Sequence, residues 1–226
     1  QSFILNVTAA KTIHVDWGDG SGNDYTGNGT RTHTYTITQD PYYIQLSGDT
    51  QWITYLDHAN RLGYGNVSKW RFPALGVSSQ ILFNGNYNLI GNLNGLIIPP
   101  NMYSFWLDGV TITGAEFELP YTGVSTFTFF MRNGALTKIP RGNIKKLSGV
   151  YGLWLGNNDI LTAELDSWFA YGNAFFATNT PVNTVTYTLN GTGMGTPTGG
   201  AANTDLVGMQ NKFTAAGKVL SVVLNS

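Results

Sequence analysis

The chain has no cysteine among its 226 residues, and only 11% of its residues are charged. Without cysteine there can be no disulfide framework, no thiolate metal site and no cysteine nucleophile. The formal net charge of −1 provides no overall attraction for nucleic acid or for an anionic membrane. No apolar run approaches about 18 residues, so the sequence predicts no membrane insertion. We therefore expect neither nucleic acid nor membrane as a partner.

Catalytic signatures are also missing. The sequence contains no Gly-x-Ser-x-Gly elbow, no phosphate-binding loop and no dinucleotide fingerprint, which predicts that the protein is not an enzyme. Apolar residues make up 42% of the chain and aromatic residues 13%, so a core can form despite the low charge. This composition is typical of rigid, β-rich proteins outside the cell, at a cell surface or in a virion, and we expect one of these locations.

The strongest pattern in the sequence is a repeat of 24 residues. Four hydrophobic pairs hold this spacing, and a third apolar position follows each pair. A fixed period of 20–29 residues predicts a solenoid in which each coil adds one strand and buries its apolar residues against the next coil. The pairs are Ile81/Phe83, Phe105/Leu107, Phe129/Met131 and Leu153/Leu155, and the third positions are Leu89, Ile112, Leu136 and Ile160.

Residues 1–50 have a different pattern, with short alternating strands around a glycine-rich turn. The segment Val15-Asp16-Trp17-Gly18-Asp19-Gly20-Ser21, followed by His33-Thr34-Tyr35, resembles the polycystin-repeat (PKD-like) domain, an immunoglobulin-type β-sandwich. The resemblance implies that these residues are structural, with a turn after a core tryptophan and a strand that pairs back onto it. It also implies a spacer or adhesion module.

Residues 51–226 resemble leucine-rich-repeat proteins over roughly 150 residues. One coil fits the pattern L-x-x-L-x-L-x-x-N-x-L completely, and its Asn158 is expected to bond backbone groups of the loop. We place an earlier coil at Trp52 and Tyr55, and a later one at Tyr187, Leu189 and Met194 after a ten-residue insertion. The fully matching coil has Val150, Leu153, Leu155, Asn158 and Ile160.

Residues 201–226 are predicted to form a cap of one helix and one strand. Asn203 can cap the helix, Leu206, Met209 and Phe213 form its apolar stripe, and Gly217 can end it. The predicted fold is therefore mainly β, with a short PKD-like module followed by a capped leucine-rich-repeat solenoid. Chains of this combination look similar to surface proteins of gut-type bacteria and to structural proteins of their phages.

A candidate ligand-binding surface follows from the repeat. Side chains alternate along a strand, so aromatic residues between the inward positions should face out from the concave sheet. A second aromatic column precedes the first by three residues, and polar groups flank both. The first column is Trp106, Phe130 and Trp154, the second is Tyr103, Phe127 and Tyr151, and the flanking residues include Asp108 and Arg132.

Three interpretations of this aromatic surface remain open. It could bind a surface glycan or a protein receptor, because flat rings beside polar groups suit both. It could instead be buried in a homo-oligomer or in a virion assembly such as a fibre, capsid or tail. The rings could also simply stabilise the sheet, at roughly 0.2–1 kcal/mol per cross-strand pair.

No cofactor is expected. The acidic turn with Asp16, Asp19 and Asp24 has oxygen groups of the kind that bind calcium, but its spacing is not that of an EF-hand. Turn formation by Asp and Gly explains the same residues.

Overall fold

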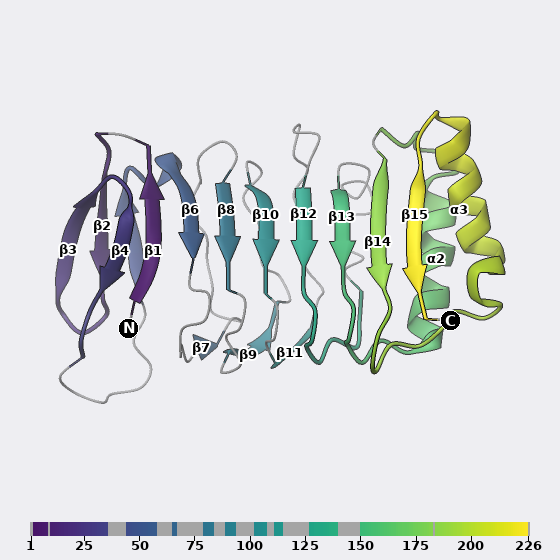
Figure 1. Cartoon of the computed structure of the whole chain (residues 1–226), viewed down its shortest axis with the longest axis horizontal. Coiled ribbons are helices and arrows are strands. Elements are labelled where there is room, and N and C mark those ends of the chain that lie inside the picture. Colours follow the sequence, from purple (N-terminus) through teal and green to yellow (C-terminus); the bar gives the residue numbers. More distant parts are fainter. Residues whose placement is uncertain are drawn as a thin grey trace.

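The protein is mainly β, with two α-helices near its C-terminal end (Figure 1). The computed structural model describes residues 2–8, 10–35, 44–57, 65–66, 79–83, 89–93, 102–107, 111–114, 127–139, 150–182 and 184–225. The strands are β1 (Ser2–Val7), β2 (Thr12–Asp16), β3 (Gly22–Thr26), β4 (Gly29–Thr32), β5 (Gln45–Gly48), β6 (Ile53–Asp57), β7 (Gly65–Asn66), β8 (Ser79–Leu82), β9 (Leu89–Asn92), β10 (Met102–Trp106), β11 (Thr111–Gly114), β12 (Phe127–Phe130), β13 (Val150–Trp154), β14 (Val185–Leu189) and β15 (Leu220–Leu224). The helices are α2 (Thr162–Phe175) and α3 (Thr204–Ala215), with short 3-10 turns at Thr50–Trp52 and Gly200–Ala202.

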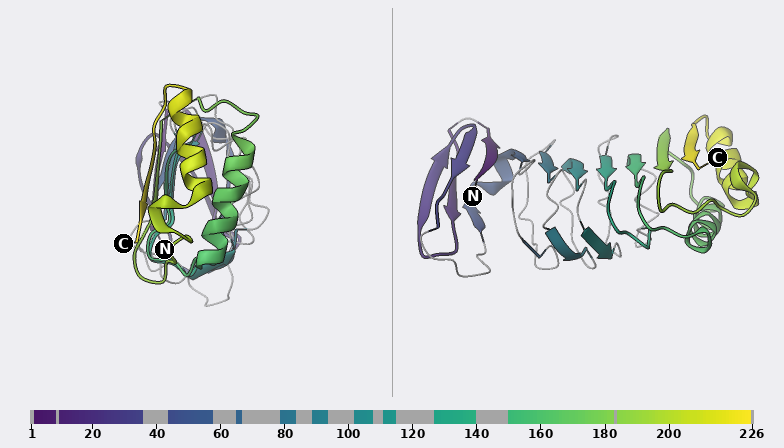
Figure 2. Two further views of the ribbon diagram at one scale, coloured as in Figure 1. Left: turned by 90° about the vertical axis from the view of Figure 1, so that its right-hand side faces the viewer. Right: turned by 60° about the horizontal axis from the view of Figure 1, so that its bottom comes forward.

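One nine-stranded sheet runs along the molecule, in the order β15-β14-β13-β12-β10-β8-β6-β1-β4. Its strands from β6 to β15 are parallel, and each pairs with the next strand of this sheet along the chain. A small parallel sheet, β11-β9-β7, lies behind the first one (Figure 2). Between β6 and β12 the described strands therefore alternate between the large sheet and the small one, and each new strand of the large sheet lies next to the previous one.

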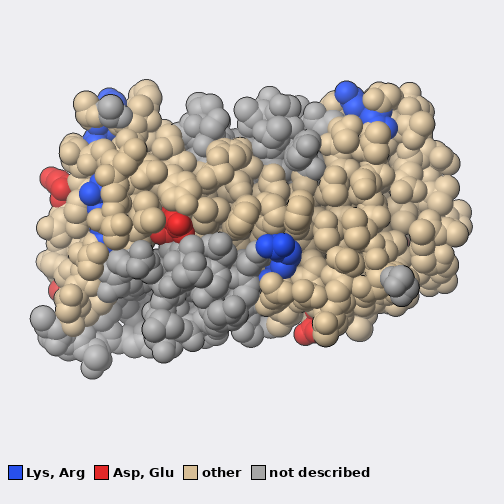
Figure 3. Space-filling view, in the orientation of Figure 1, with Lys and Arg blue, Asp and Glu red and all other residues tan. Residues whose placement is uncertain are grey.

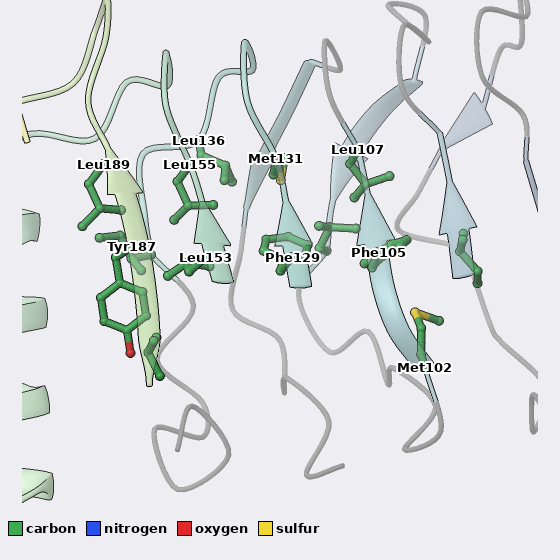
Figure 4. Close-up of a cluster of buried hydrophobic side chains, with 14 of the residues drawn as sticks. Met102, Phe105, Leu107, Phe129, Met131, Leu136, Leu153, Leu155, Tyr187 and Leu189 are labelled. Atoms are coloured by element: carbon green, nitrogen blue, oxygen red, sulfur yellow. The ribbon is translucent and has the colours of Figure 1, made fainter. Parts of the chain in front are cut away.

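The 24-residue period sets the register of these strands. Phe105 pairs with Ile81 on one side and with Phe129 on the other, and Phe129 pairs with Leu153. All four side chains are buried. Phe105, Phe129 and Leu153 point to the inner side of the sheet together with Leu107, Met131 and Leu155 (Figure 4). Seven of the predicted inward positions are thus confirmed as buried, and the eighth, Phe83, is partly buried and packs against the core. The third positions Leu136 and Ile160 are buried as well, whereas the side chains of Leu89 and Ile112 lie outside the described residues.

The first coil differs from the prediction by one residue. Leu56, not Tyr55, is the partner of Ile81, so the spacing to the next coil is 25 residues and not 26. A shift of one residue along a strand moves a side chain to the opposite face of the sheet. Tyr55 therefore faces outward beside Gln80. The sequence pattern had assigned Tyr55 to the core instead.

Asn158 connects two neighbouring coils, as its place in the repeat predicts. Its side chain is 1% exposed and donates hydrogen bonds to the carbonyl oxygens of Met131 (2.6 Å) and Leu155 (2.8 Å). Its Oδ1 accepts from the backbone N–H of Leu136 at 3.1 Å. A single amide thus satisfies three buried backbone groups on two coils.

The N-terminal residues form two β layers. β1 and β4 belong to the large sheet, and β3-β2-β5 form a separate antiparallel sheet. The layers meet at buried side chains, with the rings of Phe3 and Trp17 5.5 Å apart. β1 also pairs with β6, so the large sheet continues across the predicted boundary between residues 50 and 51. The antiparallel β1 therefore covers the edge of the first parallel strand.

At the other end, helix α3 and strand β15 lie where the sequence predicted one helix and one strand. Asn203 Oδ1 accepts from the backbone N–H groups of Asp205 and Leu206, and α3 buries Leu206, Met209 and Phe213. The sequence prediction missed α2, a helix of 14 residues in the lengthened segment between β13 and β14. Neither helix in the described part of the chain is both long and apolar enough to cross a membrane.

Tyr187 places a hydroxyl group in the core without a described hydrogen-bond partner. Burial raises the pKa of this phenol above its ordinary value. An unsatisfied buried polar group typically costs about 1–3 kcal/mol. We therefore expect Tyr187→Phe to raise the free energy of unfolding by about 1 kcal/mol, measured by urea denaturation.

The matched variant is Tyr35→Phe, because the Tyr35 hydroxyl donates to the Trp17 carbonyl oxygen at 2.9 Å. This variant should lose about 1 kcal/mol, in the opposite direction to Tyr187→Phe. A loss of stability in both variants would mean that the Tyr187 hydroxyl has a bonding partner in solution.

Candidate functional site

The first aromatic column forms a continuous ladder on the outer face of the large sheet. We define the aromatic ladder as Trp106, Phe130 and Trp154, which are paired in register on β10, β12 and β13. Ring centroids lie 4.2 Å apart for Trp106 and Phe130, and 4.7 Å apart for Phe130 and Trp154, with tilts of 53° and 50°. Trp106 and Trp154 are partly exposed, whereas the central Phe130 is only 8% exposed. The ladder therefore exposes its two outer indoles to solvent, whereas its central ring is almost completely covered.

A glycine allows one of these indoles to lie against the sheet. Gly152 precedes Trp154 by two residues on the same face, and a Cβ atom at Gly152 would come within 2.6 Å of the indole Nε1. The corresponding positions on the neighbouring strands are the small residues Thr128 and Ser104. The row of small side chains therefore leaves room for large rings to fold over it.

Arg132 lies at the side of the ladder, as predicted. Its guanidinium carbon is 5.6 Å from the ring centroid of Phe130 and 5.9 Å from that of Trp154. At this distance a guanidinium is attracted by the electron-rich ring faces. The other predicted flanking residue, Asp108, lies outside the described residues.

The second predicted column is only partly described. Tyr103 is partly exposed, and its partial burial raises the pKa of its phenol. The side chains of Phe127 and Tyr151 lie outside the described residues. Tyr103 and Tyr151 both fall where the register of paired strands shifts by one residue. Simple alternation therefore does not describe this column.

Sequence reasoning missed the polar residues that extend the ladder face toward β6. Tyr55 and Asp57 face outward on β6, in register with Gln80 and Leu82 on β8. Tyr55 Oη donates to Asp57 Oδ2 at 3.0 Å. Burial, followed by the bond to Asp57, raises the pKa of Tyr55 to about 12. Leu56 was the available signal, because an apolar residue that packs against the core between Tyr55 and Asp57 turns both of these outward. Alternation counted from the buried Ile53 gives the opposite result, because the register of β6 shifts between Ile53 and Tyr55.

The carboxylates of the acidic turn in the N-terminal module are bonded by protein groups. The Asp16, Asp19 and Asp24 carboxylates accept hydrogen bonds from different protein groups, and no metal-binding cluster of three His, Cys, Asp or Glu occurs among the described residues. Asp19 is bonded by Ser21 and by His33 Nε2 (2.7 Å), which together lower its pKa to about 2. Each of the three carboxylates therefore has at least one hydrogen-bond donor from the protein.

His33 has a structural position in the same module. Its ring stacks on Trp17 with centroids 4.9 Å apart and contacts the edge of Tyr35 at 4.6 Å. The same nitrogen, Nε2, is 2.7 Å from Asp19 and 3.5 Å from Ser21 Oγ. In a Ser-His-Asp triad the histidine uses its two nitrogens for the two partners. This arrangement is therefore not that of a triad.

The ladder lies on a face that no described element covers. Helices α2 and α3 and the small sheet lie on the opposite side of the large sheet (Figure 2). The surface over the middle strands is mostly uncharged (Figure 3). A scan against protein-family models gave no match, and searches of curated proteins and of solved structures gave none either. Inferences about function therefore depend on this face alone.

Proposed function

We propose that the chain is a non-enzymatic recognition protein that acts outside the cell, at a cell surface or on a virion. It binds a glycan or a protein of a cell surface through the aromatic ladder. The observation that carries this proposal is the partly exposed pair Trp106 and Trp154, held in register across three strands on an uncovered, mostly uncharged face. Such large rings with a polar edge commonly dominate binding surfaces.

We also propose that the fold is a leucine-rich-repeat solenoid preceded by a PKD-like module. The parallel in-register strands and the three hydrogen bonds of Asn158 support the repeat assignment. The buried Trp17, with His33 and Tyr35 packed around it, supports the N-terminal assignment. In this combination the module would serve as a spacer or adhesion unit next to the recognition face.

The alternative is an assembly protein of a fibre, capsid or tail, whose aromatic face is permanently buried by other subunits. The near-complete burial of Phe130 between its neighbours favours this alternative, because it reduces the aromatic area available to a small ligand. An assembly would also explain why the face carries so little charge (Figure 3).

The oligomeric state separates the two functions. Light scattering at two protein concentrations should show a monomer if the face is free. Acrylamide should then quench the tryptophan fluorescence of the wild type more strongly than that of a Trp106→Phe/Trp154→Phe variant. A stable oligomer with no such difference in quenching would contradict the recognition function and support the assembly function.

Loss of the ladder should abolish binding without unfolding the protein. We expect Trp106→Ala/Trp154→Ala to lose all binding on a printed glycan array or to an immobilised surface protein that retains the wild type. The ladder has two ring pairs of roughly 0.2–1 kcal/mol each, so the melting temperature should fall only slightly.

Trp52→Ala is the matched control, because Trp52 is 40% exposed and lies outside the ladder, below the amino group of Lys11. This variant should bind like the wild type. Equal binding by the wild type and the ladder variant would contradict the proposed site.

A further inference from the structure

The two exposed rings of the aromatic ladder turn the same kind of surface outward. The Nε1 atom of Trp106 is buried and has no hydrogen-bond partner among the described residues. A Cβ atom at Gly152 would come within 2.6 Å of the Trp154 Nε1, so the N–H edge of this indole lies close to the backbone of β13. Both side chains are nevertheless partly exposed. The surface that they offer to a ligand is therefore mainly the carbon of the indole rings, which suits stacking better than hydrogen bonding.

The exposed rings alternate with a covered one along the sheet. Trp106 and Trp154 lie on β10 and β13, and Phe130, which is 8% exposed, lies between them on β12. Neighbouring strands are about 4.8 Å apart, so two strand spacings separate the indoles by about 10 Å. A ligand that contacts both indoles must therefore run across the strands and bridge Phe130.

Small hydroxyl side chains lie beside these rings on the same face. Thr188 follows Trp154 in its row, and the neighbouring row has Thr128 and Thr186 on either side of a glycine. All three threonines are partly exposed, and Arg132 at the side of the ladder adds further donors. Apolar rings next to hydroxyl groups complement a pyranose, which has an apolar C–H face and hydroxyls around its edge.

We infer that the ladder binds an extended β-1,4-linked polysaccharide laid across the strands. The first and third units of a three-unit segment lie against Trp106 and Trp154. This inference rests on the proposed recognition function. One unit of such a chain is about as long as one strand spacing, so consecutive units can lie over consecutive strands. Successive units are turned over, so the first and third present the same face, which matches a ladder of two exposed rings around a covered one.

An extended peptide fits the same row less well. It advances about 3.3 Å per residue, so about three residues span the two indoles, and side chains three positions apart point to opposite sides of the peptide. Its backbone N–H and C=O groups would also lie against ring carbon without hydrogen-bond partners. A folded protein receptor is left as the other outcome of the test.

The first test is native affinity electrophoresis of the full chain through gels that contain one soluble polysaccharide each. Hydroxyethylcellulose, xylan and glucomannan represent β-1,4-linked chains, and dextran, pullulan and laminarin represent other linkages. We expect at least one of the β-1,4-linked chains to retard the wild type, and none of the others to do so.

Chain length gives the second test, because three units are needed to reach both indoles. Calorimetry with oligosaccharides of the retarding chain should show that three units bind about tenfold or more tightly than two. Trp106→Ala and Trp154→Ala should each remove this gain. Gly152→Val should do the same, because it keeps both indoles but displaces that of Trp154. Trp52→Ala is the matched control, an exposed tryptophan outside the ladder that should keep the gain, and thermal melting should show all variants folded.

Three results would overturn the inference. Equal binding of one unit and three units would mean that the site takes a single terminal sugar. Retardation by dextran, pullulan or laminarin alone would mean that the ligand is not an extended β-1,4-linked chain. If no gel retards the protein but an immobilised surface protein retains it in a ladder-dependent way, the polysaccharide inference fails and the recognition function stands.

Discussion

Asn158→Ala is expected to lower the free energy of unfolding by about 3–5 kcal/mol. The substitution removes one acceptor and two donated hydrogen bonds, and it leaves the Leu136 N–H and the Met131 and Leu155 carbonyls without their partner. Each unsatisfied buried group costs about 1–3 kcal/mol, and water that enters the space relieves part of the sum. This is a large share of the 5–15 kcal/mol that typically stabilises a folded domain.

Equilibrium unfolding in urea measures the effect, with Asn211→Ala as the matched control. Asn211 is exposed in the middle of α3, where alanine has the higher helix propensity, so the control should be neutral or slightly stabilising. A loss below about 1 kcal/mol for Asn158→Ala would mean that the loop rearranges and satisfies its backbone groups in another way.

The position of Asn158 makes this loss informative about cooperativity. Asn158 bonds Leu136 and Met131, which are 22 and 27 positions away in the sequence, and Leu155, which is only three positions away. Its side chain therefore links adjacent coils and also closes its own coil. In proteins built from stacked units, stability is the sum of the unit stabilities and the interfaces between neighbours. Loss of one such link should therefore weaken the interface between β12 and β13 most, and hydrogen exchange there should increase first.

The repeat was the part of the fold that the sequence predicted best. Apolar residues spaced by 24 have to share one face of adjacent parallel strands, because any other register would expose them. This argument placed Phe105, Phe129 and Leu153 in the core and Trp106, Phe130 and Trp154 on the outside, and the structure agrees for all six.

The helix α2 was missed for a physical reason that can be traced. The ten-residue insertion interrupts the 24-residue period, and that period indicates strands and carries no information about helical spacing. Leu165, Trp168, Phe169 and Gly172 of α2 are buried at helical intervals of three and four, and the buried Phe176 at its C-cap continues this spacing. Glycine at one of these positions weakens the pattern, although a Cβ there would meet Met209 on α3.

The candidate site was predictable only where strands are regular. The ladder follows from alternation within β10, β12 and β13, and the structure brings its three rings together. Tyr103 and Tyr151 fall at register shifts, where one extra residue breaks the alternation that the prediction assumed. Tyr55 and Asp57 were missed because the first coil is one residue shorter than the pattern assigned.

Trp168→Ala is expected to cost about 3–5 kcal/mol, because truncation of a fully buried tryptophan leaves a large cavity. Trp168 packs edge-on against Tyr187 at 5.0 Å and against Phe169 at 5.4 Å. It therefore joins α2 directly to the inner face of β14. Without this contact, the two helices lose their main anchor on the last strands of the sheet.

In Trp168→Ala, the loss of stability should first appear at the helical end of the molecule and only then extend to the whole chain. Hydrogen exchange should increase in α2, α3, β14 and β15, while β8 and β10 keep their protection at low urea, since each strand of the sheet contacts only its neighbours. Tyr171→Ala is the control, because Tyr171 is an aromatic residue of the same helix that is 44% exposed, and its loss should cost well below 1 kcal/mol. Uniform loss of protection along the whole sheet in Trp168→Ala would show instead that the coils unfold as a single unit and that the helical end holds all of them together.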